Sequence, residues 1–440
     1  MAQLHSAPNS EVECELIAAL AKRYATPVPP LDQREPLNRA YAEAMRTVYQ
    51  KNPDNSLVAV LFAESLMNLQ PWNHWTKDGK PADETVEIVS VLEKAMKRWP
   101  DHPALNHLYI HTIEASPNPE KALSAANRLR GAMPGSGHLV HMPSHIDVLV
   151  GDYERVIKTN QAAIEVDKEF LKREGALNFY TLYRVHNYHF LVYGAMFDGQ
   201  SELAWTAANE LTEQIPEEML RGQTDFVDAF MPTPLHVLIR FGRWEDILNQ
   251  PEPAAYLPMS RSTWRYARAI AYAATGRVEQ AEAEQAKFLE TKATVPETSI
   301  LFNNTSLDIL GVAEAMIAGE VEYRKGNFDL AFEHLQEAVQ RDDALNYDEP
   351  WGWMQPARHA LGALLLEQGR STEAESVYRE DLRRRPKNSW SLHGLAECLT
   401  NQGKTAEADK VRQQFQLASK RADIKIDRSC FCKLQGQTKE

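Results

Sequence analysis

Histidine is unevenly distributed along this chain: eight of its 14 histidines fall between residues 102 and 189. Two short segments in that stretch space their polar side chains by helical turns. The first holds His107, His111 and Glu114, and the second holds His138, His141 and His145. Spacings of three, four and seven residues put side chains on one face of an α-helix. Each segment therefore predicts a stripe of imidazoles along one helix.

The two stripes are related by a fixed interval. His107 precedes His141 by 34 residues, and His111 precedes His145 by the same number. In a chain that repeats one structural unit, equivalent positions of neighbouring units stack side by side. We therefore expect imidazoles from two consecutive units to face one another.

Further side chains extend the predicted site. His186 and His189 lie one helical turn apart in a third helix, and Arg184 and Tyr188 accompany them. We expect these two companions to line a substrate pocket, with Arg184 binding an anionic group.

Two carboxylates are candidates for a general base. Glu64 lies 43 residues before His107, an interval that also separates Gly199 from Gly242, so it can occupy an equivalent lining position. Glu114 belongs to the first stripe itself. His74 and His102 do not share the stripe spacing, and we expect no role for them. His236 can approach from a later unit or serve packing alone.

Converging imidazoles favour a transition metal. A first-row metal needs three or more neutral imidazoles or carboxylates at about 2.0–2.2 Å, and adjacent rigid helices can supply them. Such ligands suit copper, iron or zinc, whereas magnesium and calcium require oxygen. We expect one or two ions per chain, held by His107, His111, His138, His141, His145, His186 and His189.

The elements that must position these residues are marked by glycine turns. Each glycine follows one apolar-periodic segment and precedes another, as expected for helix, left-handed cap and helix. The turns fall at Gly151, Gly199, Gly242, Gly276, Gly326, Gly369 and Gly403. Two intervals, 242–276 and 369–403, are 34 residues, which is the period of a helix-turn-helix repeat.

The region from 353 to 419 carries small and aromatic residues at repeat positions. They are Ala360, Leu361, Gly362, Ala374, Tyr378 and Pro386, followed by Leu392, Gly394, Leu395, Ala406 and Ala408. In these residues the chain resembles the tetratricopeptide repeat family over about 38–420, most clearly in the last third. The resemblance implies an all-α, right-handed solenoid of helix pairs whose first helices line a concave surface that usually holds a peptide.

The extent of the repeat region divides the chain into three parts. We expect an N-terminal helical extension at 1–37, the solenoid at 38–420 with its histidine-rich region at 102–190, and a polar tail at 421–440. The tail contains Cys430 and Cys432, which can bind a soft metal but receive no assigned role.

Composition excludes several classes of function. The net charge is -13 and no basic stripe is present, so nucleic acid is not an expected partner. No 18 consecutive apolar residues occur, so we expect no membrane span. Four scattered cysteines do not make a disulfide framework, which suits a cytoplasmic protein.

The histidine array thus predicts a metal-dependent enzyme acting on a small organic molecule. A copper or iron oxidoreductase is favoured, because the imidazoles outnumber those that one catalytic zinc needs. A zinc-dependent hydrolase or lyase is the alternative, with Glu114 or Glu64 as general base. The third hypothesis is a non-enzymatic scaffold that binds a protein partner through the solenoid groove.

Overall fold

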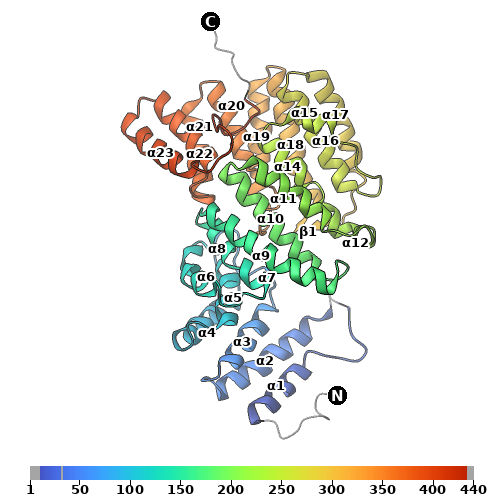
Figure 1. The fold of residues 1–440 in the computed structure, drawn as a ribbon, viewed down its shortest axis with the longest axis vertical. Coiled ribbons are helices and arrows are strands. Elements are labelled where there is room, and N and C mark those ends of the chain that lie inside the picture. The colour runs from blue at the N-terminus through green and yellow to red at the C-terminus, as the bar shows by residue number, and fades with distance from the viewer. Residues whose placement is uncertain (1–9, 31–32, 434–440) are drawn as a thin grey trace. The chain divides into compact units, whose positions relative to one another are not determined.

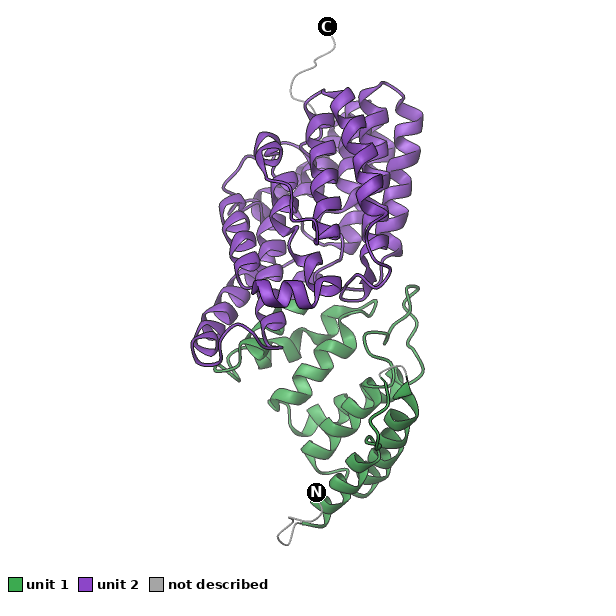
Figure 2. Ribbon diagram, turned by 90° about the vertical axis from the view of Figure 1, so that its right-hand side faces the viewer, with its two compact units in different colours: residues 1–146 green, residues 147–440 purple. Residues whose placement is uncertain are grey.

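The computed structural model describes residues 10–30 and 33–433. Residues 1–9 of the predicted extension and 434–440 of the predicted tail lie outside them. The described chain is all-α apart from one short hairpin and two single-turn 3-10 helices (Figure 1). It divides into two compact units, residues 1–146 and 147–440 (Figure 2).

The first unit is a series of short helices, of which α1 to α6 each pack on the next. Its last helix, α8, continues past residue 146. The elements are α1 (Glu11–Ala21), α2 (Glu35–Lys51), α3 (Ser56–Met67), α4 (Thr85–Arg98), α5 (Pro103–Ile113), η3 (Pro119–Ala122), α6 (Leu123–Leu129), α7 (Gly137–His141) and α8 (Pro143–Leu149).

The second unit contains longer helices, and the pairs α16 with α17, α18 with α19, α20 with α21 and α22 with α23 pack along their lengths. Its elements are α9 (Tyr153–Glu174), α10 (Thr181–Asp198), α11 (Ser201–Glu213), α12 (Glu217–Gly222), α13 (Thr224–Val227), η4 (Asp228–Phe230), α14 (Thr233–Arg240), α15 (Trp244–Asn249), α16 (Pro258–Ala274), α17 (Val278–Lys292), α18 (Ser306–Arg324), α19 (Phe328–Ala344), α20 (Ala357–Glu367), α21 (Ser371–Arg384), α22 (Ser389–Asn401) and α23 (Thr405–Ala418).

The glycine turns form as predicted. All seven turn glycines have φ between 64° and 84°, the left-handed region that a side chain disfavours. Gly199, for example, ends α10 in the left-handed conformation. The expected all-α solenoid of helix pairs is confirmed.

Apolar faces of the paired helices form the core of each unit. In the first unit Phe62, Leu92 and Ile110 are almost fully buried. In the second unit the core extends from Val148 to Cys432. Trp353 is buried against Tyr266 at a ring distance of 5.3 Å.

A two-stranded hairpin interrupts the helices, with β1 (Ile300–Leu301) antiparallel to β2 (Asn304–Thr305). Asp348 clamps this hairpin, because its carboxylate accepts hydrogen bonds from the Asn303 backbone at 2.9 Å and from Asn304 Nδ2 at 2.5 Å. The helical periodicity of the sequence gave no sign of this element.

Residues 421–433 lie on the second unit in a non-helical conformation. Asp423 accepts hydrogen bonds from the backbone N–H groups of Ser201 at 2.7 Å and Glu202 at 3.0 Å, which caps the first turn of α11. Further along, Arg240 donates to the carbonyl of Ser429 at 2.5 Å. The described part of the tail is therefore anchored to the solenoid.

Candidate metal centre

Three helices of the first unit bring five of the predicted imidazoles together. Helix α5 carries His107 and His111 one turn apart, α7 carries His138 and His141, and α8 carries His145. The sequence predicted one continuous stripe from 138 to 145. The structure splits it into two helices at Pro143, whose missing N–H interrupts the hydrogen-bond ladder.

Glu114, at the end of α5, holds two of these rings. One carboxylate oxygen accepts from His111 Nδ1 at 2.7 Å and the other from His145 Nδ1 at 2.6 Å. An ionised carboxylate only accepts, so both imidazoles carry a hydrogen on Nδ1, and in their neutral form Nε2 presents a lone pair. Metal-binding histidines are usually oriented by a carboxylate in this way.

The protonation state of Glu114 supports this arrangement. The side chain is buried, with 2% of its surface exposed. Burial by itself raises the pKa of the carboxyl, but the adjacent imidazoles of His111 and His145 outweigh it and hold the pKa well below its ordinary value. Glu114 is therefore a carboxylate at neutral pH.

Ser144 fixes the third ring. Its hydroxyl donates to the His141 carbonyl at 2.7 Å and lies 3.3 Å from Nδ1 of the same histidine. Because the hydroxyl hydrogen points to this carbonyl, Nδ1 of His141 can donate to the Ser144 oxygen, a tautomer in which Nε2 keeps its lone pair. The Nε2 atoms of His141 and His145 face each other at 2.7 Å. A hydrogen on one of the two nitrogens accounts for this approach, and a bound cation could replace that hydrogen.

A second group lies beside this pair. Nε2 of His107 and Nε2 of His138 are 3.1 Å apart, and one ligand atom from each of His107, His111 and His138 lies within 4.8 Å of the others. These three residues are partly exposed, whereas His141 and His145 are buried. The group can therefore hold an ion that a small molecule reaches.

Burial keeps the imidazoles of His107 and His138 neutral. It lowers the pKa of His138 to about 3, and it lowers the pKa of His107 well below the ordinary value, with further lowering by neighbouring imidazoles. Neutral imidazole is the form that binds a metal, so these two residues need no deprotonation at pH 7.

Two residues near the group were not assigned to it from the sequence. The Trp72 indole lies edge-on to the His111 ring at 5.6 Å. His74 is buried, and burial lowers its pKa to about 4 although the Glu114 carboxylate favours the charged form. Ser144 was missed as well. Its three-residue spacing from His141 is the signal that points to it.

Glu64 takes a different position. It is exposed on α3, and its electrostatic influence falls on Tyr41 of α2. Among the described residues it belongs to no set of three or more ligand atoms within 4.8 Å of one another. Its role as a general base stays a prediction.

The remaining predicted histidines, His186 and His189, lie on α10 in the second unit. The His186 ring packs on Phe190 at 5.0 Å and Phe302 at 5.5 Å. His189 is buried beside Phe230, and burial lowers its pKa to about 3, with a smaller contribution from His236.

Arg184 and Tyr188 share that helix. Arg184 is buried and donates from Nη2 to Thr181 Oγ1 at 2.8 Å, while its Nε and Nη1 find no hydrogen-bond partner among the described residues. Tyr188 lines a groove of about 440 Å³ together with Glu210 of α11. Burial and that carboxylate raise the pKa of its phenol. Arg358, another buried arginine of the second unit, pairs with Asp343 at 2.5 and 2.6 Å.

None of the helices in the described ranges is both long and apolar enough to cross a bilayer.

Comparison with known proteins identifies the repeat. The tetratricopeptide repeat family model matches residues 264–284 and 355–380, which contain the turns at Gly276 and Gly369. No curated protein matches the chain.

Solved structures with similar arrangements share little sequence. The human IFIT1 dimer with PPP-AAAA is 14% identical, with 93% of this chain and 73% of that chain covered and a TM-score of 0.34. Yeast Tom70 is 14% identical, with 96% and 69% covered and a TM-score of 0.34. The P58(IPK) TPR domain is 11% identical, with 94% and 97% covered and a TM-score of 0.25. The two matched segments, within regular helix pairs joined by left-handed glycine turns, show that this chain contains tetratricopeptide repeats.

Proposed function

We propose that the first unit of this repeat protein binds a first-row transition metal and uses it to act enzymatically on a small organic molecule. The observation that carries the proposal is the 2.7 Å approach of two buried imidazole nitrogens, His141 Nε2 and His145 Nε2, beside the carboxylate that contacts His145 Nδ1. A bound cation would accept a lone pair from each nitrogen. In a tetrahedral site, ligand atoms about 2.0–2.1 Å from the ion are about 3.3 Å apart, so binding spreads this pair slightly.

The number of imidazoles favours redox chemistry. Five histidines of one unit form the group, two of them bound to Glu114, whereas a catalytic zinc needs three protein ligands. Copper or iron bound there would supply one-electron or oxygen chemistry, and zinc would supply Lewis acidity and an acidified water. We favour copper or iron, with a zinc-dependent hydrolase or lyase as the alternative.

Each part of the group has its own task in this proposal. His107, His111 and His138 hold the reactive ion, because their partial exposure admits a substrate. Glu114 orients His111 and His145 instead of acting as a base, since both of its oxygens already accept hydrogen bonds. The exposed indole of Trp72 walls the approach to His111.

Metal content tests this function directly. We expect protein expressed in metal-supplemented medium to carry one or two ions per chain by elemental analysis. His111→Ala and His141→Ala should lose metal while the far-ultraviolet circular dichroism stays helical. His102→Ala, which changes a histidine at the start of the same α5 helix, should keep it. Less than about 0.3 ion per chain in the wild type contradicts the proposal, because preformed sites bind tightly.

A second function, binding of an extended peptide, is favoured by the segment 421–433. It forms hydrogen bonds or ion pairs with α14, α18, α20 and α22, which are the first helices of their pairs. The contacts run from Arg240 to Ser429, Arg324 to Cys432, Ser429 to His359 and Lys433 to Glu397. This face of the second unit thus already accommodates a peptide of its own chain.

That function has its own test. A chain ending at residue 420 should bind a labelled synthetic peptide of residues 421–440 in trans, and the full chain should bind it more weakly because its own segment competes. Equal binding by both chains would remove the groove as the binding surface.

A further inference from the structure

The segment 421–433 ends in two cysteines that are fixed inside the second unit. Their neighbour Ser429 donates from its hydroxyl to the His359 carbonyl at 2.9 Å, and its oxygen lies 2.5 Å from the Tyr378 hydroxyl. Arg324 donates to the Cys432 carbonyl. Cys432 is fully buried and Cys430 is partly exposed. The hydrogen bonds of Ser429 and of the Cys432 carbonyl therefore fix the positions of the two sulfur atoms.

A buried carboxylate faces these sulfur atoms. Glu320 of α18 has 1% of its surface exposed, and its Oε2 accepts no hydrogen bond from the described residues. Its one charged neighbour across an ion-pair distance is Arg324, with Nη2 3.7 Å away. A buried carboxylate oxygen without a donor is costly, so its presence here needs an explanation.

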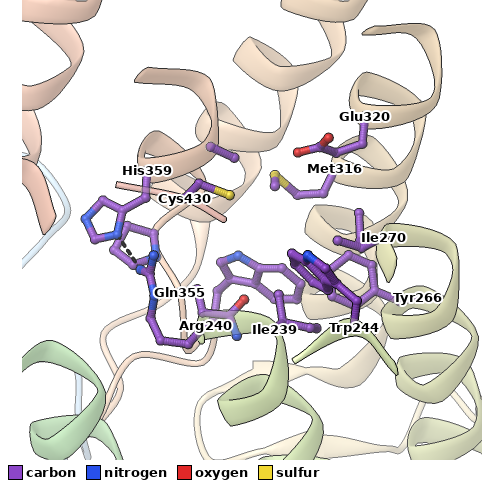
Figure 3. A pocket seen from close by; sticks show the side chains of 13 residues that line it. Ile239, Arg240, Trp244, Tyr266, Ile270, Met316, Glu320, Gln355, His359 and Cys430 are labelled. Atoms are coloured by element: carbon purple, nitrogen blue, oxygen red, sulfur yellow. Dashed lines mark hydrogen bonds between the residues drawn. The ribbon is translucent and has the colours of Figure 1, made fainter. Parts of the chain in front are cut away.

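The space between them has the size of an ion. Glu320, Cys430 and Met316 border a cavity of about 30 Å³, and Figure 3 shows the Cys430 sulfur directed toward the Met316 sulfur, with the Glu320 carboxylate beyond it. This volume suits an ion or a water molecule and excludes an organic substrate. One ligand atom from each of Glu320, Cys430 and Cys432 lies within 4.8 Å of the others.

The disulfide between Cys430 and Cys432 contributes little to the stability of the fold. It joins residues two apart in sequence. The stabilisation by a disulfide grows with the length of the loop that it closes, and this loop is among the shortest possible. Hydrogen bonds from Arg240 and Arg324 already hold the segment without it. The sulfur pair thus calls for a role other than cross-linking.

We propose that the reduced Cys430 and Cys432 thiolates, together with the Glu320 carboxylate, bind a thiophilic divalent cation of the zinc class. When the two sulfurs form the disulfide, the site does not bind the cation. Two thiolates and one carboxylate are ligands that zinc accepts, whereas monovalent copper prefers sulfur alone. Three protein ligands leave a fourth position for water in the cavity. The three negative ligands, the ion and the Arg324 guanidinium together carry no net charge, which suits a buried site.

Opening the site is a balanced redox step. Two low-molecular-weight thiols reduce the disulfide: its S–S bond breaks, each protein sulfur takes up a proton, and the reductant leaves as its own disulfide. The cation then displaces both thiol protons to solvent. The reverse exchange with a low-molecular-weight disulfide re-forms the protein S–S bond, leaves two low-molecular-weight thiols and releases the ion. This site is separate from the imidazole centre and does not depend on it.

Cadmium titration of the full chain tests the proposal, because thiolates give a cadmium charge-transfer absorption that imidazoles do not. Protein reduced with a phosphine should develop this band and saturate at about one Cd²⁺ per chain. Oxidised protein should show none. Glu320→Gln should weaken Cd²⁺ binding by at least about tenfold, since losing a ligand costs no less than losing a residue that orients one.

Cysteine variants supply the controls. Replacing Cys430 and Cys432 with Ser should abolish the band, whereas Cys398→Ser, which alters a buried cysteine of α22, should keep it. Wild-type protein compared before and after reduction needs no variant, so a folding defect cannot mimic the result. The proposal is overturned if reduced wild type gives no band, if the band survives in the double variant, or if Glu320→Gln binds Cd²⁺ as tightly as wild type.

Discussion

Glu114→Gln is the sharpest test of the imidazole centre, because it keeps the shape of the side chain and removes one acceptor. The wild-type carboxylate accepts from Nδ1 of both His111 and His145. A glutamine amide offers one oxygen and one NH₂ group, so one of the two rings must turn its Nδ1 lone pair toward that NH₂. The hydrogen of that ring then moves to Nε2, and the ring no longer presents a lone pair to a metal.

The size of the effect follows from this tautomer change. Removing a group that orients a metal-binding histidine costs about 10–100-fold in affinity. This range corresponds to about 1.4–2.7 kcal/mol of binding free energy. We therefore expect the dissociation constant for Zn²⁺ to rise by one to two orders of magnitude in Glu114→Gln.

Competition with a chromophoric chelator measures that constant. The protein is kept oxidised, so that the Cys430 and Cys432 sulfurs stay in their disulfide and do not bind the probe. Glu93→Gln is the matched control, because this exposed carboxylate of the same unit accepts only from Tyr109 at 2.9 Å among the hydrogen bonds of the described residues. Equal Zn²⁺ affinities in wild type, Glu114→Gln and Glu93→Gln would refute the orienting role of Glu114.

Three predictions concern the second unit and are measured by chemical denaturation. Asp381→Ala should lower the free energy of unfolding by about 3–5 kcal/mol, because it removes a buried carboxylate that contacts His359 and the residues around it. Burial raises the pKa of Asp381, but the groups that contact its carboxylate lower that pKa by more than burial raises it. The stabilisation that Asp381 contributes should therefore persist at neutral pH and fade below about pH 4. Gly394→Ala should cost about 1–3 kcal/mol, since its Cβ would lie 2.2 Å from the Tyr378 ring, whereas Gly222→Ala meets no atom within 4 Å and should be nearly neutral. Asp423→Ala should cost about 0.5–2 kcal/mol through the lost cap of α11.

The fold could be predicted from the sequence because its signals are local. A glycine that ends one apolar-periodic segment and precedes another fixes a left-handed turn, and all seven such glycines adopt it. The hairpin at 300–305 escaped prediction because a tight turn at Phe302 and the clamp by Asp348 produce it, and neither follows from helical periodicity.

Side-chain partners were harder to predict than helices. Spacing indicated that His111 and Glu114 share a face, but not that one carboxylate would hold rings from two helices. The anchoring of residues 421–433 was equally hidden, because Arg240, which holds this segment, is almost 190 residues away in sequence. Such contacts depend on how the pairs stack, and a single repeat does not encode that.

The 34-residue interval explains half of the histidine arrangement. It pairs His111 with His145, and these two rings do meet, across Glu114. It also pairs His107 with His141, yet Nε2 of His107 lies against Nε2 of His138 instead, at 3.1 Å. The break at Pro143 separates α7 from α8, so the two helices need not keep the register of one continuous stripe. The result is a partly exposed group beside a buried pair, which is why we expect metal stoichiometry to distinguish one ion shared by the cluster from two ions at separate positions.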